Sequence, residues 1–211
     1  MTRDSSPDLL VLHAVRILGF ADTPVIAYRF RLDPAETEEI LLDAQAYGWI
    51  QRAAFADLHG WSLTESGRIR NEQQLHEELA AIGKADRIRG LYRDFLPLNA
   101  RLQRACTDWQ LRPTPDNALY QNDHSDTAWD TRILDELAAI GSALHPLADR
   151  MGAILARLSG YEKRFDAALR RVGGGDHGWV DRTDVDSCHR VWFELHEDLV
   201  ATLGIDRRTE I

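Results

Sequence analysis

The densest polar chemistry in this 211-residue sequence lies in the run Asn122-Asp-His-Ser-Asp126 and in two histidines, His189 and His196. Residues at i and i+7 of a helix project from one face, two turns apart. Phe193 lies between the two histidines on that stripe. Imidazole and carboxylate groups bind zinc and other divalent ions. Because the spacing matches no standard zinc pattern, we assign no metal ligand.

Three interpretations of these residues remain open: a divalent metal site, a small-molecule pocket, or a structural hydrogen-bond network. In the third, Asp123 or Asp126 caps the helix that begins near Trp129. Trp109 is either a core residue whose indole N–H is satisfied locally or a stacking surface for a ligand. The residues that could line a pocket have polar or aromatic side chains: Trp109, Asn122, Asp123, His124, Asp126, His189, Phe193 and His196.

Covalent catalysis has little support. Cys188 and His189 are adjacent, and neighbours in a helix point about 100° apart, which is poor geometry for proton transfer. The sequence contains no G-x-S-x-G, Walker loop, Rossmann glycine set or H-E-x-x-H. Gly173-Gly-Gly175 lacks the strand-to-helix context of a phosphate loop. We therefore expect no enzyme, no catalytic residue and no cofactor.

Apolar spacing and capping residues predict the elements of the first third of the chain. Asp22-Thr-Pro24 and Asp33-Pro34 are cap-plus-proline helix starts, and Gly48 is a helix stop. A connection through 57–60 would join two strands. In order, we expect a helix over 8–20, a second from Thr23, a third over 34–47, strands over 49–55 and 61–63, and a helix capped by Thr64. This order is that of a winged helix-turn-helix.

The segment Trp61-Ser-Leu-Thr-Glu-Ser-Gly-Arg68 resembles winged-helix regulators of the MarR and PadR type. In those proteins a pattern like L-T-x-x-G-R ends the wing and starts the next helix. The strand leucine packs in the core, the threonine caps the helix and the glycine allows close packing. The segments 46–50 and 25–32 also resemble the turn into the wing and the first helix of the helix-turn-helix. The resemblance covers about the first 70 residues and implies DNA binding.

The charge of this first third opposes DNA binding. Glu36, Glu38 and Glu39 lie early in the expected recognition helix, where carboxylates repel phosphate. Residues 1–75 hold seven arginines, no lysine and eleven acids, a net charge of −4. These arginines either contact DNA or pair with nearby glutamates. The candidate DNA-binding residues are Arg29, Arg31, Gln45, Arg52, His59, Arg68 and Arg70.

The remainder of the chain has a helical pattern. A long helix over 85–109 carries an apolar stripe that is longer than the core of a small domain requires. This length suggests a dimer interface. A linker over 112–128 follows. Three further helices are expected near 129–144, 147–171 and 184–203, with Pro146 separating the first two. The predicted fold is therefore mainly α: a winged helix-turn-helix domain over 1–75 and an α-helical bundle over 76–211.

The helical half carries a second resemblance. The segments FLPLN, CTDWQ, NDHSD and VWFELHEDL resemble helical regions of actinobacterial proteins. Some of those proteins are regulators, and others are extensions of pyruvate, phosphate dikinase-like proteins. The phosphohistidine and nucleotide-grasp machinery of the dikinase is missing from this sequence, so the resemblance implies no dikinase activity.

Composition sets outer limits on function. The apolar share of 44% and the charged share of 28% are ordinary for a soluble globular protein. No run reaches the roughly 18–20 apolar residues of a membrane span, and Met1–Pro7 is not followed by an apolar h-region, so we expect no signal peptide. Cys106 and Cys188 are expected to be buried free thiols in a reducing cytoplasm. The net charge of −9 disfavours generic nucleic-acid binding.

We expect a cytoplasmic transcription regulator. Its winged helix would bind DNA, and its helical domain would form a homodimer or sense a small-molecule effector. In the alternative, the winged helix does not bind DNA and serves as an adaptor or accessory module. Its partner would be a protein such as a phosphoenolpyruvate-utilising enzyme.

Overall fold

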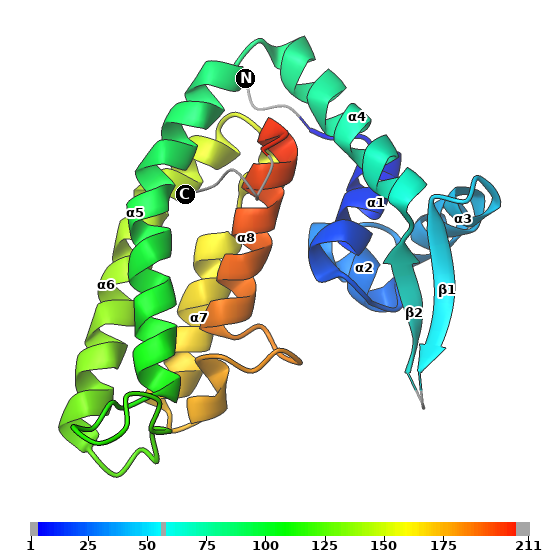
Figure 1. Cartoon of the computed structure of the whole chain (residues 1–211). Coiled ribbons are helices and arrows are strands. Elements are labelled where there is room, and N and C mark those ends of the chain that lie inside the picture. Colours follow the sequence, from blue (N-terminus) through cyan, green and yellow to red (C-terminus); the bar gives the residue numbers. More distant parts are fainter. Residues whose placement is uncertain (1–3, 56–57, 206–211) are drawn as a thin grey trace. The chain divides into compact units, whose positions relative to one another are not determined.

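The computed structural model describes residues 4–55 and 58–205. This part of the chain is mainly helical, with eight α-helices and one two-stranded antiparallel sheet (Figure 1). The elements are α1 (Pro7–Leu18), α2 (Thr23–Phe30), α3 (Pro34–Ala46), β1 (Ile50–Phe55), β2 (Leu58–Leu63), α4 (Glu65–Ile82), α5 (Ala85–Gln110), α6 (Thr127–Gly152), the 3-10 helix η1 (Ala156–Leu158), α7 (Tyr161–Gly173), the 3-10 helix η2 (His177–Trp179) and α8 (Cys188–Leu203).

The chain folds into two compact units, which differ in extent from the expected domains. Unit 1 comprises Met1–Ile88, Ile154–Arg157 and His196–Ile211, and unit 2 comprises Arg89–Ala153 and Leu158–Leu195. The boundary expected near residue 75 falls inside α4. Unit 1 therefore includes all of α4 and also takes in η1 and the second half of α8.

The helix starts of unit 1 are fixed by the predicted caps. Asp22 accepts a hydrogen bond from Val25 N at 3.0 Å, and Asp33 accepts from the amides that open α3. Thr64 Oγ1 accepts from Gly67 N at 3.1 Å and opens α4. Each contact spans two or three residues, so it is already determined by the local sequence.

The sheet is longer than expected on its second strand. We predicted a connection through 57–60, but β2 begins at Leu58, and Gly60 pairs with Ala53 in the ladder. Asp57 lies outside the described residues. A Cβ on Gly60 would lie 2.7 Å from Phe20 Cζ, so this strand glycine permits close packing rather than a turn. An isolated antiparallel bridge between Ala21 and Trp61 attaches β2 to the segment between α1 and α2.

One glycine controls the junction between the hairpin and α4. A Cβ on Gly67 would lie 1.7 Å from Trp49 O, closer than any real contact. The close packing expected from the L-T-x-x-G-R pattern is therefore confirmed at this position. The core of unit 1 forms beside it from buried apolar side chains of α1, α2, α3 and both strands: Val11, Leu12, Ala14, Val15, Ala21, Ile26, Leu41, Ala44, Ile50 and Trp61.

A buried polar network joins four elements of unit 1. Arg157 of η1 donates to Glu78 Oε2 of α4 at 3.1 Å, to Asp198 of α8, and to Thr202 Oγ1 at 2.8 Å. His13 Nε2 of α1 lies 3.0 Å from Asp198 Oδ1, at ion-pair distance but outside hydrogen-bond geometry. The side chains of His13, Arg157 and Asp198 are at most 1% exposed. These partners explain why η1 and the end of α8 belong to unit 1.

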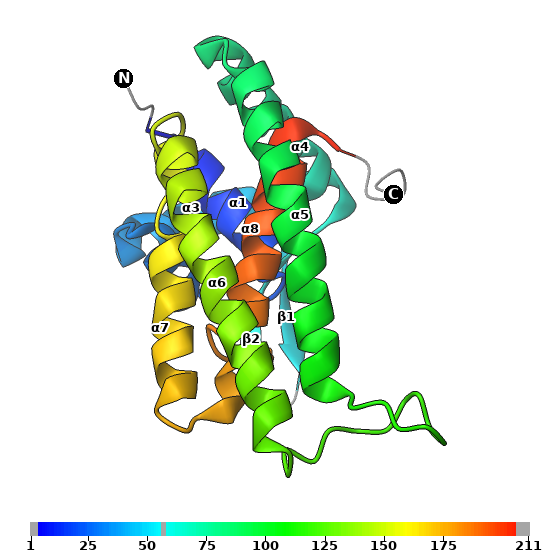
Figure 2. The ribbon, with the colours of Figure 1, turned by 90° about the vertical axis from the view of Figure 1, so that its left-hand side faces the viewer.

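Unit 2 is built from α5, α6, α7 and the first half of α8, which lie side by side in Figures 1 and 2. The Trp192 ring of α8 stacks on Phe95 at 4.9 Å, and its indole N–H donates to Asn99 Oδ1 at 2.9 Å. The expected core role of Trp192 is therefore confirmed. The predicted apolar face of α6, made of Ile133, Leu137, Ile140 and Leu144, is also buried.

The prediction that Pro146 separates two helices is wrong. α6 continues through Pro146 to Gly152. Pro146 lies on the exposed side, where the carbonyl that loses its intrahelical donor can be hydrated. Leu147 and Met151 extend the buried face beyond the proline, and their burial offsets the cost of the missing hydrogen bond.

The next two helices start later than predicted. The expected helix over 147–171 is broken between α6 and α7, in the segment that carries Arg157 into the network of unit 1. The last helix was expected from 184. It begins at Cys188 because Ser187 Oγ accepts a hydrogen bond from Arg190 N at 3.1 Å and so caps α8.

The apolar stripe of α5 was expected to form a dimer interface. Its residues are buried within this chain: Leu91, Phe95, Leu98, Leu102 and Cys106. The stripe therefore gives no support to an interface, and the homodimer stays a prediction. Among residues 4–55 and 58–205, none of the helices has the length and apolar character needed to span a membrane.

Candidate functional site

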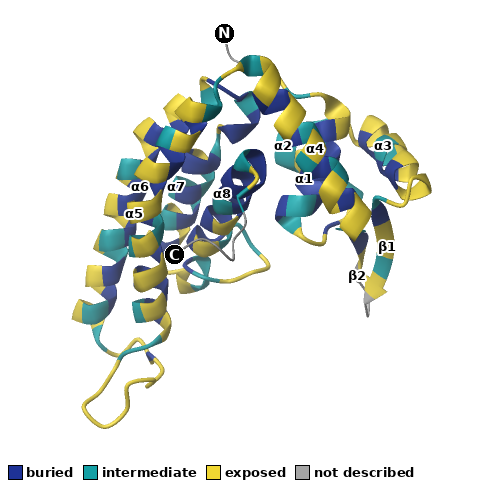
Figure 3. Ribbon diagram, turned by 45° about the horizontal axis from the view of Figure 1, so that its top comes forward, coloured by how far each residue is buried: buried dark blue, intermediate teal, exposed yellow. Residues whose placement is uncertain are grey.

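The exposed face of α3 is acidic. The helix carries Glu36, Glu38, Glu39 and Asp43 and contains no lysine or arginine. Its buried side is formed by Thr37, Leu41 and Ala44, so the acids face away from the core. Figure 3 shows α3 mostly in the colour of exposed residues. Hereafter the acidic face of α3 means Glu36, Glu39, Leu42, Asp43 and Tyr47, all exposed.

Two large apolar side chains accompany these acids. Leu42 is 48% exposed and Tyr47 is 69% exposed. The Tyr47 ring stacks on Trp49 with ring centroids 4.7 Å apart, and the Arg70 guanidinium lies 5.3 Å from the centroid of the Trp49 ring. These contacts hold the end of α3 in place and account for Arg70, one of the candidate DNA contacts.

Arg52, another candidate DNA contact, is bonded into the fold. Its guanidinium lies 4.7 Å from the Trp61 ring and donates to Glu38 Oε1 at 3.3 Å. The second oxygen of Glu38 accepts from Thr23 Oγ1 at 2.5 Å, which in turn accepts from the Trp61 indole N–H at 3.0 Å. Arg52 and Glu38 thus tie the hairpin to α3 and to the start of α2.

The remaining candidate DNA contacts lie on different elements of unit 1, and each has different neighbours. Arg29 is half-buried with its guanidinium 4.9 Å from the Phe30 ring, and Arg68 lies 4.0 Å from Glu197. Arg31 is exposed and ends α2 in the left-handed region, at φ 56°. Gln45 of α3 and His59 of β2 are exposed. No basic side chain of α3 joins them.

In unit 2 the structure brings together part of the predicted polar cluster. His124 Nδ1 lies 3.0 Å from Asp130 Oδ2, and Asn122 Nδ2 donates to Asp130 Oδ1 at 2.9 Å and to Trp109 O at 3.0 Å. The Trp109 and His124 ring centroids are 4.4 Å apart. His177 of η2 completes the group. Its ring centroid lies 5.6 Å from that of Trp109 and 6.2 Å from that of His124. We call these five residues the His124 cluster.

Burial is graded across the His124 cluster. Trp109, Asn122 and Asp130 are buried, whereas the His124 side chain is 35% exposed and His177 is exposed. Because an Nδ1–H that donates to Asp130 fixes the orientation of the ring, the Nε2 atom of His124 is left for another partner. His124 also has a left-handed backbone, at φ 57°, which is uncommon for a residue other than glycine.

The other predicted pocket residues have different roles. Asp126 accepts from Ala128 N and Trp129 N at 3.1 Å, so it is the cap that the third interpretation required. Asp123 Oδ1 accepts from Ser125 N at 3.0 Å in a local turn. The hydrogen bond from the Ser125 side chain, followed by the one from its backbone N–H, lowers the pKa of Asp123.

The three predicted residues of α8 lie on one helix. His189 and Phe193 are exposed, and His196 is half-buried. Among the described residues, every hydrogen bond and ring contact of His124 goes to Asn122, Asp130, Trp109 and His177, so the α8 histidines do not converge on it.

Sequence reasoning missed Asp130 and His177. Asp130 follows a recognised cap by four residues, and His177 lies in a glycine-rich turn. Neither position has a local pattern that points to His124, because the contact between η2 and the 122–126 segment is tertiary.

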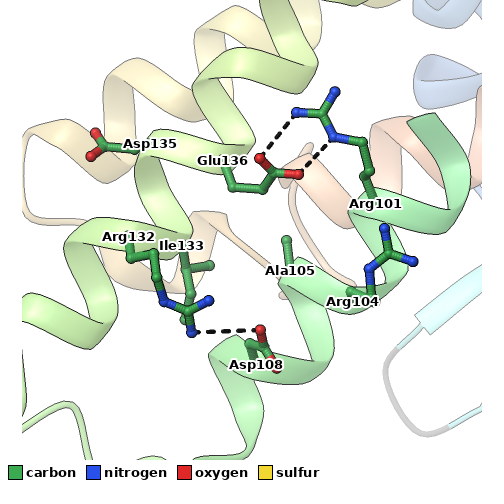
Figure 4. Close-up of a pocket in the computed structure, with 8 residues that line it drawn as sticks. All are labelled: Arg101, Arg104, Ala105, Asp108, Arg132, Ile133, Asp135 and Glu136. Atoms are coloured by element: carbon green, nitrogen blue, oxygen red, sulfur yellow. Dashed lines mark hydrogen bonds and ion pairs between the residues drawn. The ribbon is translucent and has the colours of Figure 1, made fainter. Parts of the chain in front are cut away.

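A groove of about 490 Å³ lies between α5 and α6, and its lining includes two pairs of opposite charges (Figure 4). Arg101 donates to both oxygens of Glu136 at 2.7 and 3.0 Å, and Arg132 lies 3.7 Å from Asp108. The hydrogen bond from Arg101, together with the nearby charges of Arg101 and Arg104, lowers the pKa of Glu136. Four of the charged side chains of the groove are therefore paired with one another within the protein.

Both cysteine thiols are free and buried. Burial raises the pKa of both Cys106 and Cys188 to about 12, and the charge of Asp181 contributes at Cys106. Both thiols are therefore poor nucleophiles. Across residues 4–55 and 58–205, no group of three or more histidine, cysteine or acidic residues is arranged to hold a metal ion.

A scan against models of protein families, a search of curated proteins and a search of solved structures found no match to this chain.

Proposed function

We propose that unit 1 is a winged helix-turn-helix module of the MarR and PadR type. The order α1, α2, α3, β1, β2, α4 supports this assignment, as does the antiparallel hairpin that follows α3. The bridge between Ala21 and Trp61 adds a short third pairing to that hairpin, an arrangement that suits a winged helix. In this assignment α3 occupies the position of the recognition helix.

We further propose that the acidic face of α3 binds a protein partner and that the chain is an adaptor or accessory protein. The observation that carries this proposal is the charge of α3, which has four acids and no basic residue. A recognition helix in a DNA groove lies between phosphates, where each carboxylate is repelled. The pairing of Arg52 with Glu38 removes a cation that could offset this repulsion.

The partner that suits this face is a basic segment with apolar side chains. Leu42 within α3 and Tyr47 at its end offer exposed apolar area, and large apolar side chains carry most of the binding energy in protein interfaces. Glu39 and Asp43 lie beside them and would orient lysine or arginine of the partner. The resemblance of the helical half suggests a phosphoenolpyruvate-utilising enzyme as one candidate partner.

DNA binding by a homodimeric regulator is the second candidate function. Exposed Arg31 and His59 favour it, because both could contact phosphate without help from α3. A small-molecule effector of unit 2 would belong with this candidate.

A salt titration of binding to mixed genomic DNA fragments separates the two functions. We expect no binding by the wild-type chain even at low ionic strength. The double variant Glu39→Lys/Asp43→Lys should acquire binding that falls steeply with salt. The matched control, Glu77→Lys/Asp135→Lys, alters two exposed acids elsewhere and should acquire much less. Salt-sensitive wild-type binding that weakens in Arg31→Ala/His59→Ala would replace our proposal with the regulator.

The partner is tested by affinity purification with the tagged full chain. A protein retained by the wild type and by Ile69→Ser, but lost from Leu42→Ser/Tyr47→Ser, would contact the acidic face of α3. Ile69 is a suitable control because it is also an exposed apolar residue, on α4. Equal retention by all three proteins would exclude this face as the binding surface.

A further inference from the structure

We infer that His124 and His177 form a two-histidine binding site for a divalent transition-metal ion, such as Zn²⁺ or Ni²⁺, completed by water or by an exogenous ligand. This inference concerns unit 2 and is independent of the function proposed for α3. It agrees with the finding that no group of three or more ligating residues exists among the described residues, because it requires only two protein ligands.

The first support is the arrangement behind His124. A metal-binding histidine almost always donates its second ring N–H to a carboxylate or carbonyl, which fixes the tautomer and the ring orientation. His124 has such a partner in Asp130, 3.0 Å from Nδ1. Asp130 is itself held by Asn122, which is anchored to the backbone of Trp109. Asp130 and Asn122 therefore hold the Nδ1 side of the His124 ring, and its Nε2 atom is available to bind an ion.

The second support is the spacing of the two rings. With metal–nitrogen bonds of roughly 2.0–2.1 Å, two imidazoles on one tetrahedral ion have ring centroids about 5 Å apart. The centroids of His124 and His177 are 6.2 Å apart, with an interplanar angle of 59°. Shared coordination therefore requires the exposed His177 ring to approach His124 by about 1 Å.

The third support is what holds the rings in place. Trp109 is buried and contacts both histidines, one tilted against its ring and the other edge-on. The contact with Trp109 and the hydrogen bond to Asp130 together hold the ring of His124. In contrast, His177 is exposed and makes no hydrogen bond from its ring to any described residue. It is free to turn a nitrogen towards an ion.

Imidazole is the preferred protein ligand of zinc, nickel and copper, whereas magnesium and calcium prefer oxygen ligands. The site should therefore select a transition metal over Mg²⁺. With only two protein ligands it leaves open coordination positions, so the ion could bind a further anionic or nitrogen ligand.

Isothermal titration of the full-length chain with Zn²⁺ and, separately, Ni²⁺ tests the site. We expect one equivalent to bind, with affinity reduced about tenfold or more in His124→Ala and in His177→Ala. The outer-shell variant Asp130→Asn should weaken binding by about 10- to 100-fold. The control His189→Ala, another exposed histidine of unit 2, should bind as the wild type does.

Two outcomes of the titration would contradict the metal site. Absence of binding to the wild type, or binding unchanged by His177→Ala, would overturn it. The His177 variant removes an exposed side chain from a short turn and should leave the fold intact, so it decides the question even if His124→Ala is unstable. Intrinsic fluorescence gives a second readout, because Ni²⁺ or Cu²⁺ at this site should quench Trp109, and Trp109→Phe should remove that part of the quenching.

Discussion

The two units contain the same chemical pair in different surroundings. In unit 1, His13 Nε2 lies 3.0 Å from Asp198 Oδ1, and neither side chain is exposed. In unit 2, His124 Nδ1 lies 3.0 Å from Asp130 Oδ2, with the side chains 35% and 10% exposed. The distance is the same, so distance does not distinguish the roles of the two pairs.

Burial and neighbours do distinguish them. Asp198 also accepts from Arg157, whose other donors go to Glu78 and Thr202, so the carboxylate of unit 1 is enclosed by protein donors. No ion or substrate can reach it, and its role is to hold four elements together. The pair in unit 2 faces solvent on one side of the His124 ring, which is the condition for binding a ligand. A histidine–aspartate pair is thus a structural element when enclosed and a candidate site when open.

The largest expected effect comes from removing the cation of the enclosed network. Arg157→Met leaves Glu78 and Asp198 buried without their counter-charge, and should lower the free energy of unfolding by about 3–5 kcal/mol. Urea denaturation followed by circular dichroism measures this. The control Arg150→Met removes an exposed ion pair with Asp94 and should change stability by under about 0.5 kcal/mol. Similar losses in both variants would contradict a structural role for the network.

A smaller effect is expected in the open cluster. Asp130→Ala removes the acceptor of Asn122 and His124, but water can reach the site and Asn122 keeps its bond to Trp109 O. The free energy of unfolding should fall by about 1–2 kcal/mol. A loss as large as that of Arg157→Met, measured in the same urea titration, would mean that the His124 cluster is mainly structural.

The smallest effect is expected at a third histidine–aspartate pair. His145 Nε2 lies 2.9 Å from Asp166 Oδ2, with side chains 46% and 32% exposed. Because solvent screens this pair, His145→Ala should change the free energy of unfolding by less than about 0.5 kcal/mol. Thermal unfolding monitored by calorimetry would show a nearly unchanged midpoint. A loss of unfolding free energy larger than that of Asp130→Ala would contradict the proposed order, in which enclosed pairs stabilise the fold more than exposed pairs.

Local sequence determined much of the fold. Asp22, Asp33, Thr64 and Asp126 each cap a helix through amides two or three residues away, and such contacts are the same in any tertiary setting. The order of three helices, a hairpin and a further helix follows from these caps and from apolar spacing. The acidic character of α3 is also a property of its sequence alone, and it survives in the structure as an exposed acidic face.

Tertiary packing decided the rest. Pro146 was expected to end a helix, but the buried residues that follow it keep α6 intact. Arg52, a candidate phosphate contact, also meets Glu38 and Trp61, two contacts made by the fold. Arg157 meets Glu78 across 79 residues and Asp198 across 41, and His124 meets His177 only because η2 packs beside Trp109. The sequence by itself determines the helix caps and the apolar faces, because these depend on residues close together in the chain. Which histidine is enclosed and which stays open depends on contacts between segments far apart in the chain, which no local pattern encodes.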